Sequence, residues 1–587
     1  MELTTALHEL FGFRDFRAGQ RDACEAALEG RDVLVVMPTG SGKSLCYQLP
    51  VLLRHDLTLV VSPLVALMQD QVEGLAALGH GERVALVNSQ QEAGVNQEAL
   101  RRAAAGELRL LYVAPERFSA PGFLERVSGM RVGLFVVDEA HCVSQWGHDF
   151  RPDYFRLADA ARAVGARSLV ASTATATPRV AQDVAHRLRM REPLRVATGF
   201  DRPDISFAVA RPAGHEKRAL VAQLLREPQA LPAIVYAGTR AGAEEIALEL
   251  EQAIGERALA YHAGLDRGRR AEVQRAFLAD EAPVIVATNA FGMGIDKPDV
   301  RSVIHASVPS SLEAYYQEAG RAGRDGLPAR AVLLAENRDK ALHVHFIRSE
   351  EVEDGLPAWL ADRLAAAADG DGRYALDAAE LARQVGGFDR LKALLGHLAR
   401  AGVVAPSPSA PDSVEGRVQS AFDRRADALC RASIEDGARA RWRQYREIWA
   451  YVEGRSCRRR TILRHFGDTS EPAPGTGPCC DACDQGLVPI IPAPEPSSFA
   501  DLDEAIVSVA RSARPAVGRT TCAEILHGAR TKKLVRNSYD GLPAYGCWSH
   551  LPRGRILARV DELIAEGRLG TSGGPYPVLR LPAREAA

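Results

Sequence analysis

The chain has 587 residues, too many for one ordinary hydrophobic core, which indicates roughly three to five domains. Hydrophobic residues make up 46% of it and charged residues 25%, a balance that excludes a disordered or membrane-embedded protein. The formal net charge is only −2, so any binding of nucleic acid must depend on local basic patches.

The N-terminus and the cysteines indicate a reducing compartment. Residues 1–4 are not a basic segment followed by an apolar one, and no apolar run is long enough to cross a bilayer, so we expect a cytoplasmic protein. Ten cysteines in so long a chain do not form a disulfide framework. Several are crowded between Cys457 and Cys483, which favours a metal site.

Short β-branched strands alternate with longer amphipathic stretches from residue 33 to about residue 334. This alternation predicts βα units that form parallel sheets. The expected strands are residues 33–36, 57–61, 109–113, 132–137, 234–236, 284–287, 303–305 and 332–334. A gap near residues 200–203 separates two groups, so the sequence predicts tandem α/β domains over residues 1–200 and 201–348.

Beyond residue 348 we expect the strands of these sheets to stop. Two amphipathic helices, a short strand and a Pro/Ser-rich loop follow, at residues 376–385, 388–401, 402–404 and 406–411. This order fits a small winged-helix domain or a plain helical hairpin over residues 349–416.

The C-terminal third is expected to contain a helical segment, a linker and a last domain. Residues 417–486 are mostly helical and end in the cysteine cluster, and residues 487–499 form a Pro-rich linker. Residues 500–587 end in a pattern typical of a winged helix. Its expected parts are a helix at 555–566, a strand at 568–569, a turn at 573–575 and a strand at 578–581.

The first group of strands contains a candidate phosphate-binding loop, MPTGSGKS at residues 37–44. It follows an apolar strand and precedes a helix, where backbone amides can bind phosphate. Lys43 would contact the outer phosphates and Ser44 would bind magnesium. The predicted nucleotide-binding residues of the loop are Thr39, Gly40, Ser41, Gly42, Lys43 and Ser44. A glycine-rich turn without nucleotide is the alternative.

Two acids, Asp138 and Glu139, follow the strand that ends at residue 137. They would therefore lie at the carboxyl edge of a parallel sheet, where ligands bind in such folds. Asp138 suits magnesium, and Glu139 suits orienting or deprotonating the attacking water. The acids are a weak signal alone, but with the phosphate loop roughly one hundred residues upstream they complete both halves of one nucleotide site.

The second group of strands ends near an arginine pair, Arg321 and Arg324, in the segment 317–324. Three residues apart on a helix, the two side chains would share one face. We predict that both reach the γ-phosphate bound by the first domain, and Gln317 completes the predicted catalytic set. An isolated arginine pair would otherwise be solvated surface.

These motifs resemble those of superfamily-two helicases, whose members commonly lack a glycine at the position of Met37, and more closely those of RecQ-type DNA helicases. Residues 11–20 resemble the RecQ adenine-recognition motif. The resemblance implies that Gln20 binds the edge of the base while Phe13 and Arg17 flank its ring. Phe13 stands where many members have Tyr, and stacking needs only the π-face.

Further segments resemble motifs that contact DNA or couple it to ATP: residues 61–64, 172–176 and 288–298. The most discriminating is 144–154, which resembles the aromatic-rich loop of RecQ proteins and offers stacking surfaces and a cation directly after the acids. The residues that the resemblance assigns to DNA binding or coupling are Ser62, Pro63, His141, Trp146, Phe150 and Arg151, with Asp296 linking ATP to the tracked strand.

The resemblance weakens after about residue 335. RecQ proteins usually pass almost directly from the motor to a zinc-binding subdomain, so residues 349–416 resemble an insertion. The implied Zn²⁺ ligands are Cys457, Cys479, Cys480 and Cys483, a tetrahedral Cys₄ site. Because Cys479 and Cys480 have lost the usual spacer, Cys430 is a candidate substitute for one ligand, and a cluster that has lost its metal is the alternative.

The final domain resembles a shortened version of the RecQ winged-helix module, and we expect no further helical strand-binding domain after it. Basic residues outnumber acids there, which suits phosphates of duplex DNA. They include Arg530, Lys532, Lys533, Arg536, Arg553, Arg555 and Arg559. Surface basicity without function is the alternative.

The resemblance therefore implies an ATP-dependent DNA helicase of recombination and repair, moving 3′ to 5′ on single-stranded DNA, with two RecA-like domains around ATP. The expected cofactors are ATP, Mg²⁺ and Zn²⁺. Expected partners are single-stranded and duplex DNA and a single-strand-binding protein, with no membrane, a favoured monomer and a nucleoid-associated location. The aromatic loop and the cysteines argue against an RNA helicase, and intact motor residues argue against a non-catalytic DNA-binding or annealing scaffold.

Overall fold

The computed structural model describes residues 2–88, 90–119, 122–144, 154, 157–212, 216–292, 297–349, 351–407, 412–484, 486–487, 501–529, 531, 533–534, 537, 539–572 and 577–581. The chain forms two compact units, Met1–Arg211 with Val221–Val488 and Pro212–Leu220 with Pro489–Ala587. Within these described ranges, no helix is both long and apolar enough to span a bilayer.

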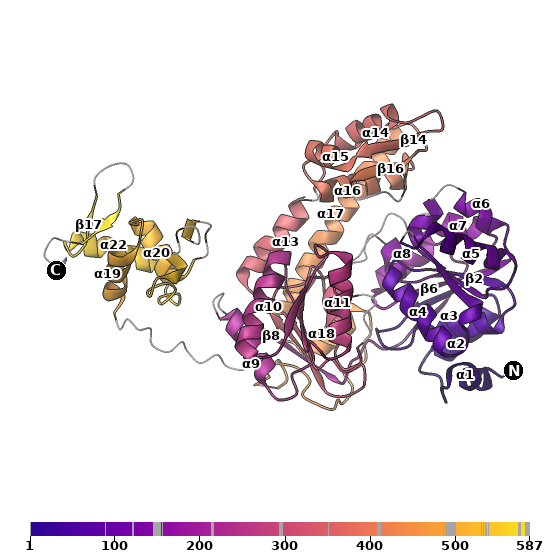
Figure 1. The fold of residues 1–587 in the computed structure, drawn as a ribbon, viewed down its shortest axis with the longest axis horizontal. Helices are drawn as coiled ribbons and strands as arrows, with labels where there is room; N and C mark the ends of the chain where they lie inside the picture. Colours follow the sequence, from indigo (N-terminus) through magenta and orange to yellow (C-terminus); the bar gives the residue numbers. More distant parts are fainter. Residues whose placement is uncertain are drawn as a thin grey trace. The chain divides into compact units, whose positions relative to one another are not determined.

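The first motor domain is a parallel sheet with strand order β3-β4-β2-β5-β6-β1-β7, drawn in indigo and purple in Figure 1. Its strands are β1 Val33–Val36, β2 Leu57–Val61, β3 Val84–Val87, β4 Leu110–Val113, β5 Val132–Val137, β6 Ser168–Thr173 and β7 Leu194–Ala197. Its helices are α1 Leu3–Phe11, α2 Gln20–Leu28, α3 Leu45–Leu53, α4 Val65–Ala77, η1 Gly81–Arg83, α5 Ala93–Ala104, η2 Pro115–Ser119, α6 Phe123–Ser128, η3 Ala140–Val143, α7 Leu157–Ala163 and α8 Pro178–Arg187.

The second motor domain is also a parallel sheet, with order β10-β11-β9-β12-β13-β8. Its strands are β8 Ile205–Ala210, β9 Ala233–Tyr236, β10 Ala258–Tyr261, β11 Val284–Ala287, β12 Ser302–His305 and β13 Ala329–Leu334. Its helices are α9 Lys217–Arg226, α10 Arg240–Ile254, α11 Arg267–Leu278, α12 Leu312–Ala319 and α13 Asn337–Ser349.

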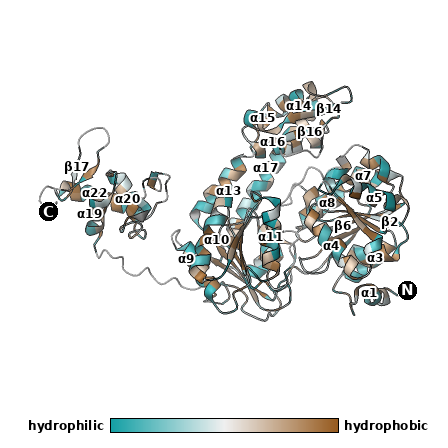
Figure 2. Ribbon diagram, in the orientation of Figure 1, coloured by the Kyte–Doolittle hydropathy of each residue, from teal (hydrophilic) through white to brown (hydrophobic). Residues whose placement is uncertain are grey.

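Continuous apolar strands explain why both sheets are buried between helices. In β1, Leu34 and Val36 pack into one core while Val33 and Val35 pack into another, so both faces of the strand are covered. Figure 2 shows the same pattern as brown strands among helices with teal outer surfaces. The predicted fold class, tandem RecA-like domains built on parallel sheets, is confirmed.

The segment after the motor is a small α/β domain. The strands of the two parallel sheets end with β13, as predicted, but this domain contains a sheet of its own, with more strands than the one predicted at residues 402–404. A small antiparallel sheet of order β14-β16-β15 is covered by α14, α15 and α16. The bounds are α14 Leu356–Ala366, β14 Arg373–Asp377, α15 Ala378–Val385, α16 Phe388–Arg400, β15 Val404–Ser407 and β16 Ser413–Val418. Residues 408–411 of the predicted loop lie outside the described residues.

The helix predicted at residues 376–385 is divided between a strand and a helix. Asp377 ends β14 and caps α15, because its carboxylate accepts a 2.6 Å hydrogen bond from the Glu380 amide. Tyr374 is buried between exposed neighbours, the alternation of a half-buried strand. Because β14 is short, the apolar residues of β14 and α15 form one amphipathic pattern along the sequence, and this pattern predicted a single helix.

A long helix, α17 Arg424–Glu453, follows this domain and leads to α18 Arg458–His465 beside the cysteines. The start of α17 packs into the core of the small domain through Ala426 and Cys430. Its end packs into the motor core through Ile448, Trp449 and Tyr451.

The C-terminal unit has its own core between α19 Leu502–Ser512, α20 Arg519–His527 and α22 Arg553–Ala565. The helical turn η5 Tyr539–Gly541 and the strands β17 Gly570–Thr571 and β18 Leu579–Arg580 complete its described elements. The strand predicted at residues 568–569 begins later, because both of these amides bond the Leu563 carbonyl at the end of α22. The predicted turn at 573–575 lies outside the described residues.

Candidate nucleotide site and metal centre

The phosphate loop connects β1 to α3 and has two glycines in the left-handed region. Gly40 and Gly42 have φ of 79° and 81°. A Cβ on Gly42 would lie 2.6 Å from Nε2 of Gln20, which donates to the carbonyls of Ser41 at 3.0 Å and Gly42 at 3.1 Å. The loop conformation therefore depends on glycine at residue 42 and on the side chain of Gln20.

A pocket of about 310 Å³ lies beside this loop, and Phe13, Arg17, Gln20 and Ser44 are among its lining residues. Phe13 is 54% exposed, so its ring face is available for stacking. The guanidinium of Arg17 donates to the Gly40 carbonyl at 2.6 Å. Gln20 here contacts loop backbone with its amide nitrogen and accepts from the Arg17 amide at 2.8 Å. Its predicted contact with a base would require it to exchange these partners.

The acid pair lies at the end of β5, at the carboxyl edge of the sheet. The Asp138 amide bonds the Val61 carbonyl of β2 at 2.8 Å. Burial, and then the charge of Glu139, raises the pKa of Asp138 to about 7, and Lys43 opposes this rise. Glu139 has a left-handed φ of 45°, an uncommon conformation for a non-glycine residue that is frequent at functional sites.

His141 connects the acids to the next strand. Its Nδ1 lies 3.0 Å from the Thr173 hydroxyl of β6 and 3.3 Å from a Glu139 carboxylate oxygen. Burial alone would lower the pKa of His141, but contacts with Cys142 and Glu139 raise it well above the ordinary histidine value. The His141 imidazole therefore contacts both Glu139 and Thr173, so a movement of Glu139 can alter the segment 172–176.

The arginines lie in a turn and not on a helix, which corrects the predicted helical pair. Helix α12 ends at Ala319, and residues 320–324, here called the arginine turn, follow it. Gly323 has a φ of 60° and its amide bonds the Val300 carbonyl, so the chain leaves the helical path. Gln317 is buried in the last turns of α12.

The arginine turn contacts the phosphate loop of the first domain. The Thr39 hydroxyl donates to the Gly320 carbonyl at 3.3 Å. The Arg324 side chain lies beside Gly40, 3.6 Å from where a Cβ would stand. Burial lowers the pKa of Lys43, and the charge of Arg324 lowers it further. The charges of Glu139 and Asp138 oppose this and raise the pKa of Lys43.

Arg321 lies deeper than Arg324, among residues of the second sheet. It is 5% exposed, and its side chain contacts the Tyr236 hydroxyl and approaches Gly292. The charges of Asp138, Glu139 and Arg324 each act on Lys43, whereas Arg321 is held by contacts within the second domain.

The predicted DNA-contacting residues are only partly described. Ser62 is buried and Pro63 is half-buried directly after β2. The residues of this set that lie outside the described residues are Trp146, Phe150, Arg151 and Asp296. At the start of the aromatic-rich segment, the Ser144 hydroxyl donates to Asp183 of α8 at 2.7 Å.

The cysteine cluster meets the geometric demands of zinc. Cys457, Cys479, Cys480 and Cys483 have Sγ atoms within 4.8 Å of one another, and Cys457 lies 3.6 Å from Cys479. Tetrahedral Zn–S bonds of about 2.3 Å place neighbouring sulfurs about 3.8 Å apart, close to the observed separation. The Arg458 amide donates to Sγ of Cys480 at 3.3 Å. The cysteines therefore fit Zn²⁺ as predicted.

Cys430 does not belong to this cluster, which corrects its candidacy as a substitute ligand. It is buried in α17 against the small domain, and its thiol donates to the His397 carbonyl at 3.5 Å. Adjacent Cys479 and Cys480 are both usable because the chain turns after them, with the Cys483 amide bonding the Cys480 carbonyl at 3.0 Å.

Two arginines beside Cys457 form buried contacts that the sequence analysis did not assign. Arg458 pairs with Asp481 at 2.9 Å, and Arg459 pairs with Asp201 at 2.7 Å. Asp201 belongs to the segment that marked the boundary between the motor domains. No local signal in the sequence could have found this pair, because the two residues are 258 positions apart.

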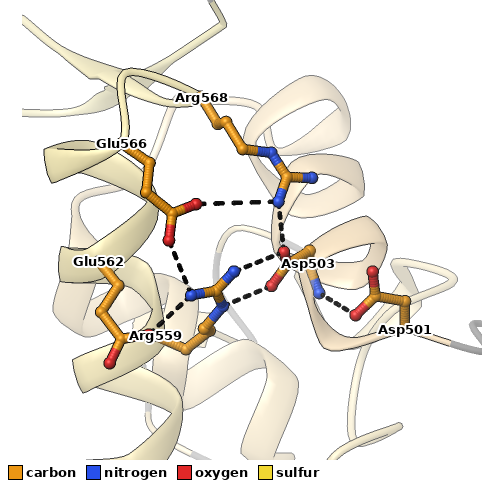
Figure 3. Close-up of polar contacts among 6 residues, drawn as sticks. All are labelled: Asp501, Asp503, Arg559, Glu562, Glu566 and Arg568. Atoms are coloured by element: carbon orange, nitrogen blue, oxygen red, sulfur yellow. Dashed lines mark hydrogen bonds and ion pairs between the residues drawn. The ribbon is translucent and has the colours of Figure 1, made fainter.

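Arg559 of the C-terminal unit, predicted as a DNA contact, forms ion pairs within its own domain. It donates to both carboxylate oxygens of Asp503 at 2.7 Å and also contacts Glu562 and Glu566 (Figure 3). Arg568 contacts the same Asp503 carboxylate. Arg553 lies 3.4 Å from Glu524, whereas Arg555 is exposed. Arg530, Lys532 and Arg536 lie outside the described residues.

The two parallel sheets, the phosphate loop, the acids and the arginine turn define an ATP-driven motor of helicase superfamily two. Four family models match the chain: DEAD/DEAH box helicase at residues 17–184, Helicase conserved C-terminal domain at 216–326, RecQ zinc-binding at 423–485 and RQC domain at 499–587. The chain belongs to the RecQ family of helicases.

Curated relatives agree with this assignment. "Probable ATP-dependent DNA helicase RecS" of Bacillus subtilis is 36% identical over 86% of this chain and 96% of its own length. "ATP-dependent DNA helicase RecQ" of the same organism is 31% identical over 98% of this chain and 81% of its own length. The RecQ protein of Pasteurella multocida is 44% identical, but the chain spans only 54% of that relative.

A solved structure supports the fold alone. The "DUF1998 helicase MrfA bound to DNA" is 19% identical, with a TM-score of 0.50 over 73% of this chain and 63% of that chain.

The cofactors expected for the family, ATP with Mg²⁺ and Zn²⁺, fit the residues present.

Proposed function

We propose that the chain is an ATP-dependent DNA helicase that translocates 3′ to 5′ on single-stranded DNA and unwinds duplex DNA in recombination and repair. The observation that supports this most directly is that Arg324 of the second domain lies beside Gly40 of the phosphate loop. Its charge acts on Lys43, as do the charges of Asp138 and Glu139. Hydrolysis that requires residues of two domains can couple ATP turnover to their relative movement.

In this proposal each residue of the site has one task. Lys43 binds the outer phosphates, Ser44 and Asp138 hold Mg²⁺, and Glu139 orients the attacking water. Arg324 stabilises the charge that develops on the γ-phosphate, with Arg321 and Gln317 behind it. Phe13, Arg17 and Gln20 bind the adenine. Ser62, Pro63, His141, Trp146, Phe150, Arg151 and Asp296 contact DNA or couple it to hydrolysis.

We extend the proposal to the remaining parts of the chain. Residues 1–200 and 201–348 form the motor, 349–416 an inserted winged helix, 417–486 the zinc-binding subdomain and 500–587 a winged helix after the linker 487–499. In 351–416 acidic side chains outnumber basic ones, which disfavours contact with phosphates, whereas the last domain is basic. The proposed setting is a monomer in the cytoplasm, at the nucleoid, working with a single-strand-binding protein.

The rate of ATP hydrolysis under four conditions tests the proposal: with single-stranded DNA, with forked duplex, with RNA and without nucleic acid. We expect strong stimulation by single-stranded and forked DNA and little by RNA. Stimulation by RNA alone would support an RNA helicase, and no hydrolysis under any condition would support a non-catalytic scaffold. Strand separation on duplexes with only a 3′ or only a 5′ tail tests polarity, and unwinding from the 5′ tail alone would contradict it.

A further inference from the structure

We propose that Arg202 is a positioning residue, which holds the arginine turn against the phosphate loop, and that the zinc-binding subdomain holds Arg202 in place through Asp201. The inference rests on the proposed function, because it gives a task in ATP hydrolysis to a residue that does not touch the nucleotide.

Arg202 binds the backbone of the arginine turn on both sides of Arg321. Its Nη1 donates to the Gly320 carbonyl at 2.8 Å, and its Nη2 donates to the Ala322 carbonyl at 2.7 Å. The planar guanidinium fixes the distance between its two donors, so the two carbonyls cannot move independently. The backbone that presents Arg321 and Arg324 is thereby fixed from one side.

The opposite side of Gly320 faces the phosphate loop. The Gly320 carbonyl that accepts from Arg202 also accepts from the Thr39 hydroxyl. A Cβ on Gly320 would lie 2.9 Å from that hydroxyl oxygen and 3.4 Å from Nη1 of Arg202. The turn is therefore packed too closely between the two side chains to shift without changing one of these contacts.

Arg202 follows a residue that the zinc-binding subdomain fixes. The Asp201 carboxylate accepts from Arg459 Nε at 2.9 Å and Nη2 at 2.7 Å, and from the Ala473 amide at 2.7 Å. Arg459 is 3% exposed and lies in α18, two residues after Cys457. Three hydrogen bonds on one carboxylate set the position of the backbone from which Arg202 extends.

The same subdomain also contacts the helix that precedes the turn. Phe466 stacks on Phe200 with ring centroids 4.4 Å apart and lies 4.9 Å from the Tyr316 ring of α12. The Tyr316 hydroxyl donates to the Phe200 carbonyl at 2.8 Å. His465 lies 3.0 Å from Glu313 at the start of α12. Both chain segments that lead to the arginine turn are thus fixed by residues near the cysteine cluster.

The test compares Arg202→Ala, Arg202→Lys and Asp201→Asn in the full chain with zinc bound, measuring kcat and KM for ATP in the presence of single-stranded DNA. A displaced catalytic group costs about 10- to 100-fold in rate, so we expect Arg202→Ala to lower kcat by that factor and to leave KM for ATP within about threefold. Lys cannot bond two carbonyls at once, so Arg202→Lys should recover only part of kcat. Asp201→Asn, the milder change, should lower kcat less than Arg202→Ala.

Arg330 provides a matched control, because it is also half-buried and bonds backbone and side-chain oxygens of its own domain, away from the turn. Arg330→Ala should leave kcat near the wild-type rate. The double variant Arg202→Ala with Arg324→Ala decides whether Arg202 acts through the turn. If it does, the loss of kcat in the double variant falls short of the product of the two single losses, because only Arg321 is then left for Arg202 to position.

Independent, multiplicative losses of kcat in the double variant would overturn the inference. An unchanged kcat in folded Arg202→Ala would also overturn it. If Arg202→Ala does not fold, an unchanged kcat in Asp201→Asn has the same meaning. A parallel fall of kcat, ATP binding and thermal stability in Asp201→Asn would show a purely structural role and would also overturn it. If Arg324→Ala itself had no effect on kcat, the proposed function would fail instead.

Discussion

The hydroxyl of Thr39 donates to the carbonyl of Gly320 over 3.3 Å, although 281 positions separate the two residues in the sequence. This bond joins the phosphate loop of the first sheet to the arginine turn of the second. The proposed site therefore takes residues from both domains, and we expect hydrolysis to depend on how the turn meets the loop.

Lys43→Ala and Glu139→Ala should each abolish most ATP turnover while DNA affinity remains near that of the wild type. Both groups act on charge and water at the phosphate, so we expect kcat to fall by at least about 100-fold. Steady-state ATP hydrolysis and fluorescence-anisotropy binding of single-stranded DNA measure the two effects. Glu125→Ala, an exposed acid of α6, is the control. Turnover near the wild-type rate in either variant would remove its residue from the site.

Arg324→Ala should lower DNA-stimulated kcat far more than it changes KM for ATP. An arginine from the opposite domain stabilises charge mainly as the transition state forms, and such residues contribute about 10³-fold or more. Equilibrium binding of a non-hydrolysable ATP analogue should therefore stay nearly constant. A variant with weakened analogue binding and unchanged kcat would contradict this role.

Removing zinc should destabilise the chain and reduce its DNA affinity. A closed Cys₄ site contributes folding energy, so Cys457→Ser and Cys479→Ser should lower zinc content and the thermal unfolding midpoint. Elemental analysis of the purified variants measures the metal. Cys430→Ser is the matched control, because Cys430 lies in a different core and should leave zinc content unchanged. A folded, active preparation of the wild type without zinc would contradict the site.

Acidification should destabilise the small α/β domain through His397. Burial lowers the pKa of His397 to about 4, below the ordinary value near 6.5, so the unfolded chain binds a proton that the folded chain does not. The contribution of neutral His397 to the free energy of unfolding is therefore fully present above pH 6.5 and is lost as the pH falls toward 4. This contribution is at most on the order of 3 kcal/mol. Thermal unfolding between pH 7 and 5 should therefore depend less on pH in His397→Asn. The same slope in His397→Asn and wild type would exclude this effect, and exposed His55 provides the control variant His55→Asn.

Arg559→Ala should lower the unfolding midpoint of the C-terminal domain, because it removes two hydrogen bonds to the nearly buried carboxylate of Asp503. Arg555→Ala, at an exposed position on the same helix, should leave the midpoint unchanged and weaken duplex DNA binding. Duplex affinity at several salt concentrations separates the two arginines. Equal effects of both variants on stability would contradict the assignment.

The sequence by itself determined the architecture of the motor and the residue types of its proposed site. Continuous apolar strands such as Val33–Val36 can only be buried on both faces, which predicts parallel sheets. The phosphate loop, the acids and the cysteines are local patterns, so their residue types and spacing were readable without a fold. The sequence did not reveal β14 or the strand shift at Gly570, because such short strands are decided by hydrogen-bond partners distant in the chain.

Only the tertiary structure decided which side chains meet. Arg321 and Arg324 lie in a turn because Gly323 bonds Val300, far away in the sequence. Cys430 is excluded from the metal centre because α17 carries it into another core. The Arg459–Asp201 ion pair joins residues 258 positions apart, and no local pattern specifies such a pair. Periodicity and motifs report on neighbours along the chain, whereas pairing of distant charges follows from how whole domains pack.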